Sequence, residues 1–158
     1  QVEKHIDEHY GTHHARDCAE LFATRNLALN LFSSAIKLNT QYLHVLQFNL
    51  VVKEPTTLQK VIDRLDADDR ISLTEKSSTN QIFAFGRDHG HFGRILNQAI
   101  VSVPTLQVRA EHEIIGFAFT SQEGNSLVSS VAIAEWFLYP HSYEEKVQCL
   151  NELYFNEV

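Results

Sequence analysis

The residues best suited to chemistry in this sequence are its histidines, and four of the nine fall within the first fourteen positions. Spacings of four residues would place His5, His9 and His13 on one face of a helix, in an arrangement that can bind a metal ion. Gly11 and Thr12 interrupt such a helix, and the ends of a chain are usually mobile. We therefore expect a solvated polar segment and no metal site, with a metal-dependent site at the three histidines as an alternative hypothesis.

Thr12, His13 and His14 form a second candidate site, because they bring a hydroxyl group and two imidazole rings to the expected start of a helix. The free backbone N–H groups and the partial positive charge of a helix N-terminus attract phosphate or carboxylate groups. The three residues could therefore bind a small phosphorylated ligand. In the alternative interpretation, which the residues by themselves favour, Thr12 caps the helix and both histidines are ordinary surface residues.

His44 is the third candidate, since it interrupts a strongly apolar segment that contains Leu43, Val45 and Leu46. A titratable group in such surroundings must find a hydrogen-bond partner or stay neutral. His44 is thus either a general base or a hydrogen-bonded residue of the core, and the sequence by itself favours the second.

A glycine-rich segment at 85–94 carries two histidines and two arginines. It could contact an anion, a neighbouring subunit or only water, and Arg87 and Asp88 could simply pair with each other at the surface. The segment does not have the spacing of a dinucleotide-binding motif, and the sequence contains no P-loop, nucleophile elbow or metalloprotease motif.

The composition indicates one globular domain over residues 1–158, with 44% apolar and 21% charged residues. The net charge of −7 argues against nucleic acid as a partner, because phosphate binding needs clustered positive charge. The two cysteines are far apart, and no stretch is apolar enough to span a membrane or to serve as a signal peptide. We expect a cytoplasmic protein. Because the chain lacks any methionine, we also expect it to be trimmed or cut from a longer protein.

Hydrophobic periodicity predicts alternating helices and strands. Helices are expected at 13–24, 56–65 and 126–138 and after Ser142, and strands at 27–38, 42–52, 71–73, 95–103, 106–108 and 113–120. Thr56 is expected to cap the second helix, strand 42–52 is expected in the middle of the sheet, and turns are expected at 39–40 and 124–125. Segment 77–90 stays open between helix and strand. Short connections predict an α+β fold, with a mixed, largely antiparallel sheet and helices packed mainly on one face.

Three segments resemble the catalytic domain of the archaeal-type (class II) glyceraldehyde-3-phosphate dehydrogenases. Residues 11–17 (G-T-H-H-A-R-D) are similar to the family's S-H-H-G-P-D element, residues 39–44 (N-T-Q-Y-L-H) to its P-T-T-L-M-H strand, and residues 78–90 to its S-T-A-x-I-x-x-x-A-R-D-L-G segment. Their order and approximate spacing agree over nearly the whole chain.

The resemblance implies the mixed, largely antiparallel sheet with helices that this family packs beside its nucleotide domain, an NAD(P)-dependent oxidoreductase activity, and a role for each candidate residue. It implies that His44 is the general base, and that His13 and His14, with Thr12 before them, lie near the phosphate sites. In this family a cysteine thiolate attacks the aldehyde, the hydride passes to NAD or NADP, and phosphate releases the acyl group.

The sequence departs from the family in parts that the reaction needs. It has no S-C-N-T-T element with the nucleophilic cysteine, no Gly-rich nucleotide domain and no arginine pair before the histidine motif, and Ala15-Arg16 replaces Gly-Pro. We therefore expect a module that binds no cofactor by itself, is inactive in isolation, and needs a nucleotide-binding domain in cis or in trans. The alternative is a non-enzymatic domain that binds a small anion or dimerises. In either case the chain could form a homo-oligomer. An exposed His44 close to His13 or His14 would favour the enzyme, and a sealed, hydrogen-bonded His44 far from them would favour the alternative.

Overall fold

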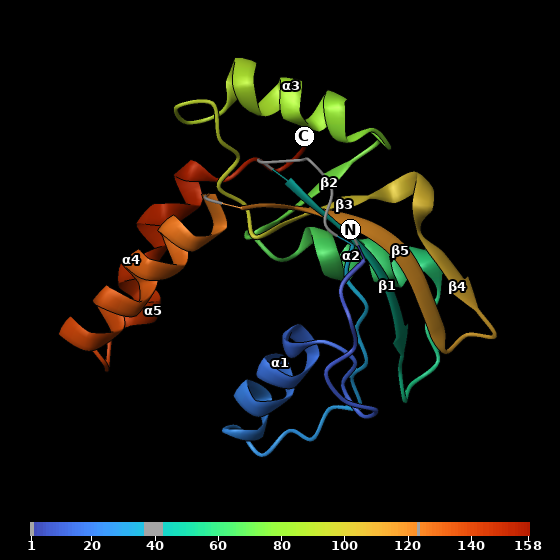
Figure 1. The fold of residues 1–158 in the computed structure, drawn as a ribbon. Coiled ribbons are helices and arrows are strands. Elements are labelled where there is room, and N and C mark those ends of the chain that lie inside the picture. Colours follow the sequence, from blue (N-terminus) through green and yellow to red (C-terminus); the bar gives the residue numbers. More distant parts are fainter. Residues whose placement is uncertain (1, 37–42, 123) are drawn as a thin grey trace. The chain divides into compact units, whose positions relative to one another are not determined.

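The computed structural model describes residues 2–36, 43–122 and 124–158 (Figure 1). The chain divides into two compact units, Gln1–Thr40 and Gln41–Val158, and each is described by itself. The first unit is short for a domain that folds by itself. The expectation of one domain over the whole chain therefore stays a prediction. The turn expected at 39–40 lies outside the described residues.

The first unit contains one helix, α1 (His13–Ala23), where the sequence predicted it. The strand predicted at 27–38 is wrong over residues 27–35, which form neither helix nor strand, and Ile36 makes only an isolated bridge to Val2. Residues 37 and 38 lie outside the described part. Leu27 and Phe32 are more than half exposed, so the alternating pattern here does not mark the buried face of a strand.

The second unit is built on a five-stranded mixed sheet in the order β1-β5-β3-β2, with β4 also paired to β5. Within the part of the chain that the structure describes, β2 and β3 pair in parallel and the other strand pairs are antiparallel. The strands are β1 (Leu43–Val51), β2 (Ile71–Thr74), β3 (Ala99–Ser102), β4 (Gln107–Arg109) and β5 (Glu113–Ser121). The predicted α+β class and largely antiparallel sheet are confirmed.

The strand β1 lies at an edge of this sheet and not in its middle, because among the described residues it pairs with β5 alone. Its apolar residues on both faces led to the wrong expectation. Val45 and Leu46 point to opposite faces, and each is about half exposed, at 46% and 49%. The apolar pattern of this strand therefore marks exposed surface as well as core.

The helices of the second unit are α2 (Leu58–Asp66), α3 (Thr79–His89), α4 (Gly124–Leu138) and α5 (Tyr143–Lys146), with 3₁₀ turns at Val103–Thr105 and Val147–Leu153. The N-cap of α2 is Thr57 and not Thr56, since the Thr57 hydroxyl accepts a hydrogen bond from Lys60 N at 3.3 Å. Residues 77–90 mainly form a helix, and the turn expected at 124–125 is instead the first part of α4. Within the described residues, no helix is both long and apolar enough to cross a membrane.

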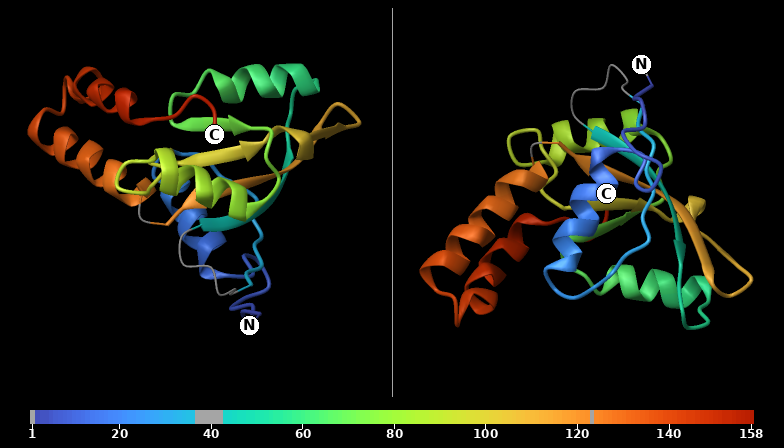
Figure 2. Two further views of the ribbon diagram at one scale, coloured as in Figure 1. Left: turned by 90° about the horizontal axis from the view of Figure 1, so that it is seen from above. Right: turned by 60° about the horizontal axis from the view of Figure 1, so that its bottom comes forward.

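Two hydrophobic clusters cover opposite faces of the sheet. Ile100 and Phe119 pack with Ile82 of α3, whereas their chain neighbours Val101 and Ala118 pack with Ile62 of α2. Because successive residues of a strand point to opposite faces, α2 and α3 lie on different sides of the sheet, as Figure 2 shows in its left view. The expectation that helices pack mainly on one face is therefore corrected for these two.

Candidate functional site

His44 lies at the second position of β1 and is exposed. It stands opposite Thr120 of β5, and the alternation of the strand places it on the same face as Leu46 and Phe48. Among the described residues, no hydrogen bond holds its ring, so the alternative of a sealed, hydrogen-bonded core histidine is not what the structure shows. The imidazole is therefore accessible to a ligand from solvent.

A small cavity lies next to the same strand ends but on the opposite face of the sheet. Its volume is about 30 Å³, and its lining includes Leu43 and Ser121, the chain neighbours of His44 and Thr120. The other lining residues are Ile82, Phe83, Gly86, Gly93, Arg94 and Ile95. A space of this size holds about one or two water molecules, so it is not a substrate pocket for His44.

Thr12 has a buried side chain and is used inside the first unit. Only 1% of its surface is exposed, and its hydroxyl shares a hydrogen bond with that of Ser33 at 2.6 Å. It occupies the N-cap position of α1 without a side-chain capping bond. This hydrogen bond thus links the start of α1 to the segment around Ser33.

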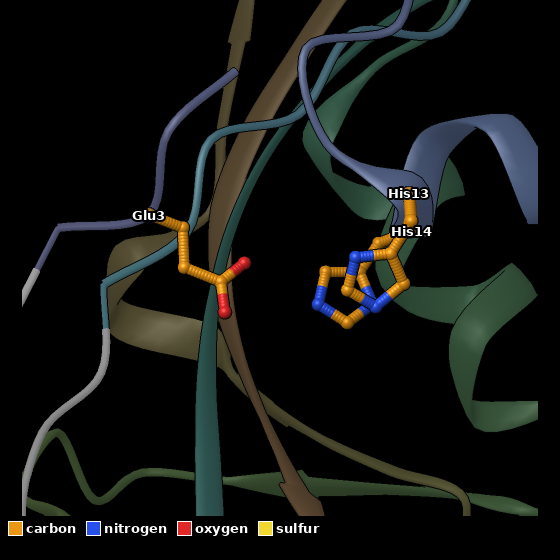
Figure 3. A group of neighbouring side chains, drawn as sticks. All are labelled: Glu3, His13 and His14. Atoms are coloured by element: carbon orange, nitrogen blue, oxygen red, sulfur yellow. The ribbon is translucent and has the colours of Figure 1, made fainter. Parts of the chain in front are cut away.

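His13 and His14 are both exposed at the start of α1, and their ring centroids lie 4.0 Å apart. The structure brings Glu3 to them: one potential ligand atom from each of the three residues lies within 4.8 Å of the others (Figure 3). Sequence reasoning missed Glu3, because no spacing motif links a carboxylate to histidines ten residues further on.

The chain path that creates this arrangement depends on Gly11. Its φ of +73° belongs to the left-handed region that favours glycine, and a Cβ there would overlap the Ser33 carbonyl oxygen. Ile6 N donates to the Gly11 carbonyl at 2.6 Å, which closes a loop over residues 6–11. Glu3 N in turn donates to the Ala35 carbonyl at 3.0 Å. These bonds fix the segment carrying Glu3 and the start of α1 within one unit.

His5, His9 and His13 do not share a helical face, because residues 2–12 form no helix. His5 Nε2 lies 2.9 Å from the Ser34 hydroxyl, and the ring of His9 packs edge-on against Tyr10. The alternative metal site at these three histidines is therefore not assembled in the structure.

Arg87 and Asp88 form a bidentate surface pair, with Nε–Oδ1 and Nη2–Oδ2 distances of 2.7 and 2.8 Å. The hydrogen bonds from Arg87 lower the pKa of Asp88 and raise that of Arg87. This bears out the expected surface pairing.

The two cysteines are separate from the histidines just described. Cys18 is half-buried in α1, and Cys149 is exposed in the 3₁₀ turn, where its thiol contacts the Lys146 carbonyl at 3.1 Å. Within the described residues, neither thiol is paired with an imidazole as a nucleophile would be.

His44 belongs to the unit 41–158, whereas Thr12, His13 and His14 belong to the unit 1–40.

Neither the family models nor the curated proteins contain a match to this chain. Proposals about function therefore depend on the residues themselves and on the segments that resemble the dehydrogenase family.

Proposed function

We propose that this chain is a catalytic-domain-like module of a phosphorylating aldehyde dehydrogenase of the glyceraldehyde-3-phosphate dehydrogenase type, inactive in isolation. The observation that supports the proposal is the exposed position of His44 on β1. A general base must reach its substrate, and the histidine that corresponds to the family's base is accessible.

In this proposal, His44 accepts a proton from the substrate while a cysteine of a partner domain holds the aldehyde carbon. An imidazole on a paired strand suits this role, because the backbone of β1 is fixed by its pairing along β5. The chain has no Gly-rich phosphate-binding motif, so its residues do not fit NAD or NADP. Cofactor binding and the nucleophilic thiolate are therefore assigned to a nucleotide-binding domain, joined in cis or in trans.

Domain complementation tests the proposal. The 158-residue chain is mixed with a nucleotide-binding domain of this dehydrogenase class that carries the S-C-N-T-T element, and NAD(P)H formation from glyceraldehyde 3-phosphate and phosphate is followed. The chain alone should form none, and the mixture should be active. His44→Asn should reduce the rate by about a hundredfold or more, as expected for loss of a general base. His141→Asn, at another exposed histidine, is the matched control.

Two results would contradict this proposal. One is NAD(P)H formation by the purified chain alone, since the chain lacks the nucleophile element and the nucleotide domain. The other is activity of the mixture that His44→Asn leaves unchanged.

A non-enzymatic dimerisation domain is the second candidate, and the exposed apolar surface of α4 favours it. Most of the apolar side chains of this helix are exposed, among them Leu127 at 56% and Leu138 at 67%; Val128 is buried. Trp136 and Phe137 are exposed as well. Patches of this kind often mark interfaces. Sedimentation equilibrium distinguishes the candidates: this one predicts a dimer that Phe137→Glu converts to a monomer, whereas a monomeric parent chain excludes it.

A further inference from the structure

Glu3, His13 and His14 form a cluster of three metal-binding side chains that comes from two separate segments. Glu3 lies in the N-terminal segment and is half-buried, and the histidines open α1 and are exposed. Figure 3 shows the Glu3 carboxylate directed toward the two imidazole rings. One carboxylate oxygen and one nitrogen from each ring lie within 4.8 Å of one another.

The backbone on both sides of the cluster is held by hydrogen bonds. Glu3 N donates to the Ala35 carbonyl at 3.0 Å, and Ser33 N donates to the Tyr10 carbonyl at 3.0 Å. The buried Thr12 hydroxyl bonds that of Ser33 at 2.6 Å. The segment 33–36 thus links the N-terminal segment that carries Glu3 to the start of α1 through hydrogen bonds. The three side chains are brought together by the fold of this unit and not by sequence spacing.

The donor set determines which ion would fit. Two imidazole nitrogens and one carboxylate oxygen are the ligands of borderline divalent transition metals such as Zn²⁺, whereas Mg²⁺ and Ca²⁺ prefer oxygen ligands alone. In a tetrahedral Zn²⁺ site, bond lengths of about 2.0–2.1 Å put neighbouring ligand atoms about 3.3 Å apart. The three ligand atoms, which lie within 4.8 Å of one another, must therefore approach by at most about 1.5 Å, which the exposed histidine side chains can achieve by rotation.

Charge at the cluster favours a cation over the phosphate group expected from the sequence. The helix N-terminus attracts anions, but the Glu3 carboxylate beside both rings opposes a phosphate and adds a ligand for a metal. The Thr12 hydroxyl, which was expected to help bind phosphate, is buried against Ser33. The net charge of −7 also favours cation binding.

We propose that Glu3, His13 and His14 bind one divalent transition metal ion of the Zn²⁺ type, with the remaining coordination position open to water. This differs from the expectation of no metal site, which considered only histidines in helical spacing. The site lies wholly within residues 1–40 and does not depend on the proposed dehydrogenase function. Since imidazole binds a metal only in its neutral form, acidification should release the ion.

Metal titration of the full chain tests the proposal. Co²⁺, whose visible absorption reports ligand geometry, is added to the metal-free chain, followed by Zn²⁺ in competition with a chromophoric chelator. We expect the first equivalent of metal ion per chain to bind more tightly than any further equivalents. Glu3→Gln, His13→Asn and His14→Asn should each lower the affinity for this first ion by about tenfold or more. His9→Asn and His141→Asn are matched controls at exposed histidines outside the cluster, and should leave the affinity unchanged.

The same titration identifies the results that would overturn the proposal. Equal weakening by cluster and control variants would mean scattered binding at surface histidines. Retained affinity in Glu3→Gln, with an unchanged circular dichroism spectrum, would remove the carboxylate from the site. Titration with inorganic phosphate tests the alternative, an anion site at the start of α1. NMR shifts of the His13 and His14 rings with phosphate, but none with Zn²⁺, would also overturn the proposal.

Discussion

The side-chain amide of Asn97 forms two hydrogen bonds with the backbone of Phe155: its Nδ2 donates to the Phe155 carbonyl at 2.9 Å, and its Oδ1 accepts from Phe155 N at 3.0 Å. Asn97 is completely buried. Beyond Phe155, Glu157 bridges Leu73 of β2, and the side chain of Val158 enters the core at 1% exposure. One buried amide therefore anchors the last segment of the chain beside the sheet.

Replacing this amide should destabilise the second unit. Asn97→Ala leaves the N–H and the carbonyl of the half-buried Phe155 without these partners, and each loss costs about 1–3 kcal/mol. We expect the free energy of unfolding to fall by about 2–4 kcal/mol in urea denaturation. Asn49→Ala is the control, because Asn49 bonds Glu113 at an exposed position, and it should cost less than about 0.5 kcal/mol. Equal losses in the two variants would show that the paired bonds do not anchor the segment.

Local sequence signals predicted the elements whose cause is local. The stripe of Leu58, Val61, Ile62 and Leu65 correctly predicted α2, because an amphipathic helix satisfies its own backbone hydrogen bonds. A strand needs a neighbour to do so. The alternation at Leu27 and Leu29 looked like that of the true strands, but residues 27–35 have no strand partner. The sequence pattern contains no information about that missing partner.

The candidate sites were predictable to different degrees for the same reason. His44 was placed on a strand correctly, yet its exposure depends on what packs against its face of the sheet, which is a tertiary property. The approach of Glu3 to His13 and His14 depends on the left-handed conformation of Gly11 and on bonds to residues 33–35. Gly11 was visible in the sequence only as a break in a helix.

The Arg87–Asp88 pair predicts a depressed titration of one carboxyl group. Hydrogen bonds from Arg87 lower the pKa of Asp88 below its usual value of 3.8. NMR titration of the Asp88 carboxyl carbon should show this, and Arg87→Ala should return the midpoint toward 3.8. A pKa lowered by folding gives stability above the unfolded pKa, which is lost as the pH falls through the folded pKa. The pair is exposed, so the effect on unfolding should be slight. An unchanged midpoint in Arg87→Ala would contradict the assignment.

Glu135 in α4 has a buried carboxylate oxygen, Oε2, with no hydrogen-bond partner among the described residues. Burying a charged oxygen without a partner is costly. Glu135→Gln removes the charge and keeps the shape, so we expect the free energy of unfolding to rise by about 1 kcal/mol. Glu152→Gln, at an exposed glutamate, should have no such effect. Thermal denaturation followed by circular dichroism measures both, and a lower midpoint for Glu135→Gln would show that the carboxylate is stabilising.

Access of a phosphorylated aldehyde to His44 is the central claim about function. NMR spectra of the histidine rings, recorded while glyceraldehyde 3-phosphate is added to the full chain, measure it directly. The account predicts saturable shifts of the His44 ring that exceed those of the exposed control His141. Absence of any change at His44 up to millimolar ligand, or identical shifts at both rings, would contradict it.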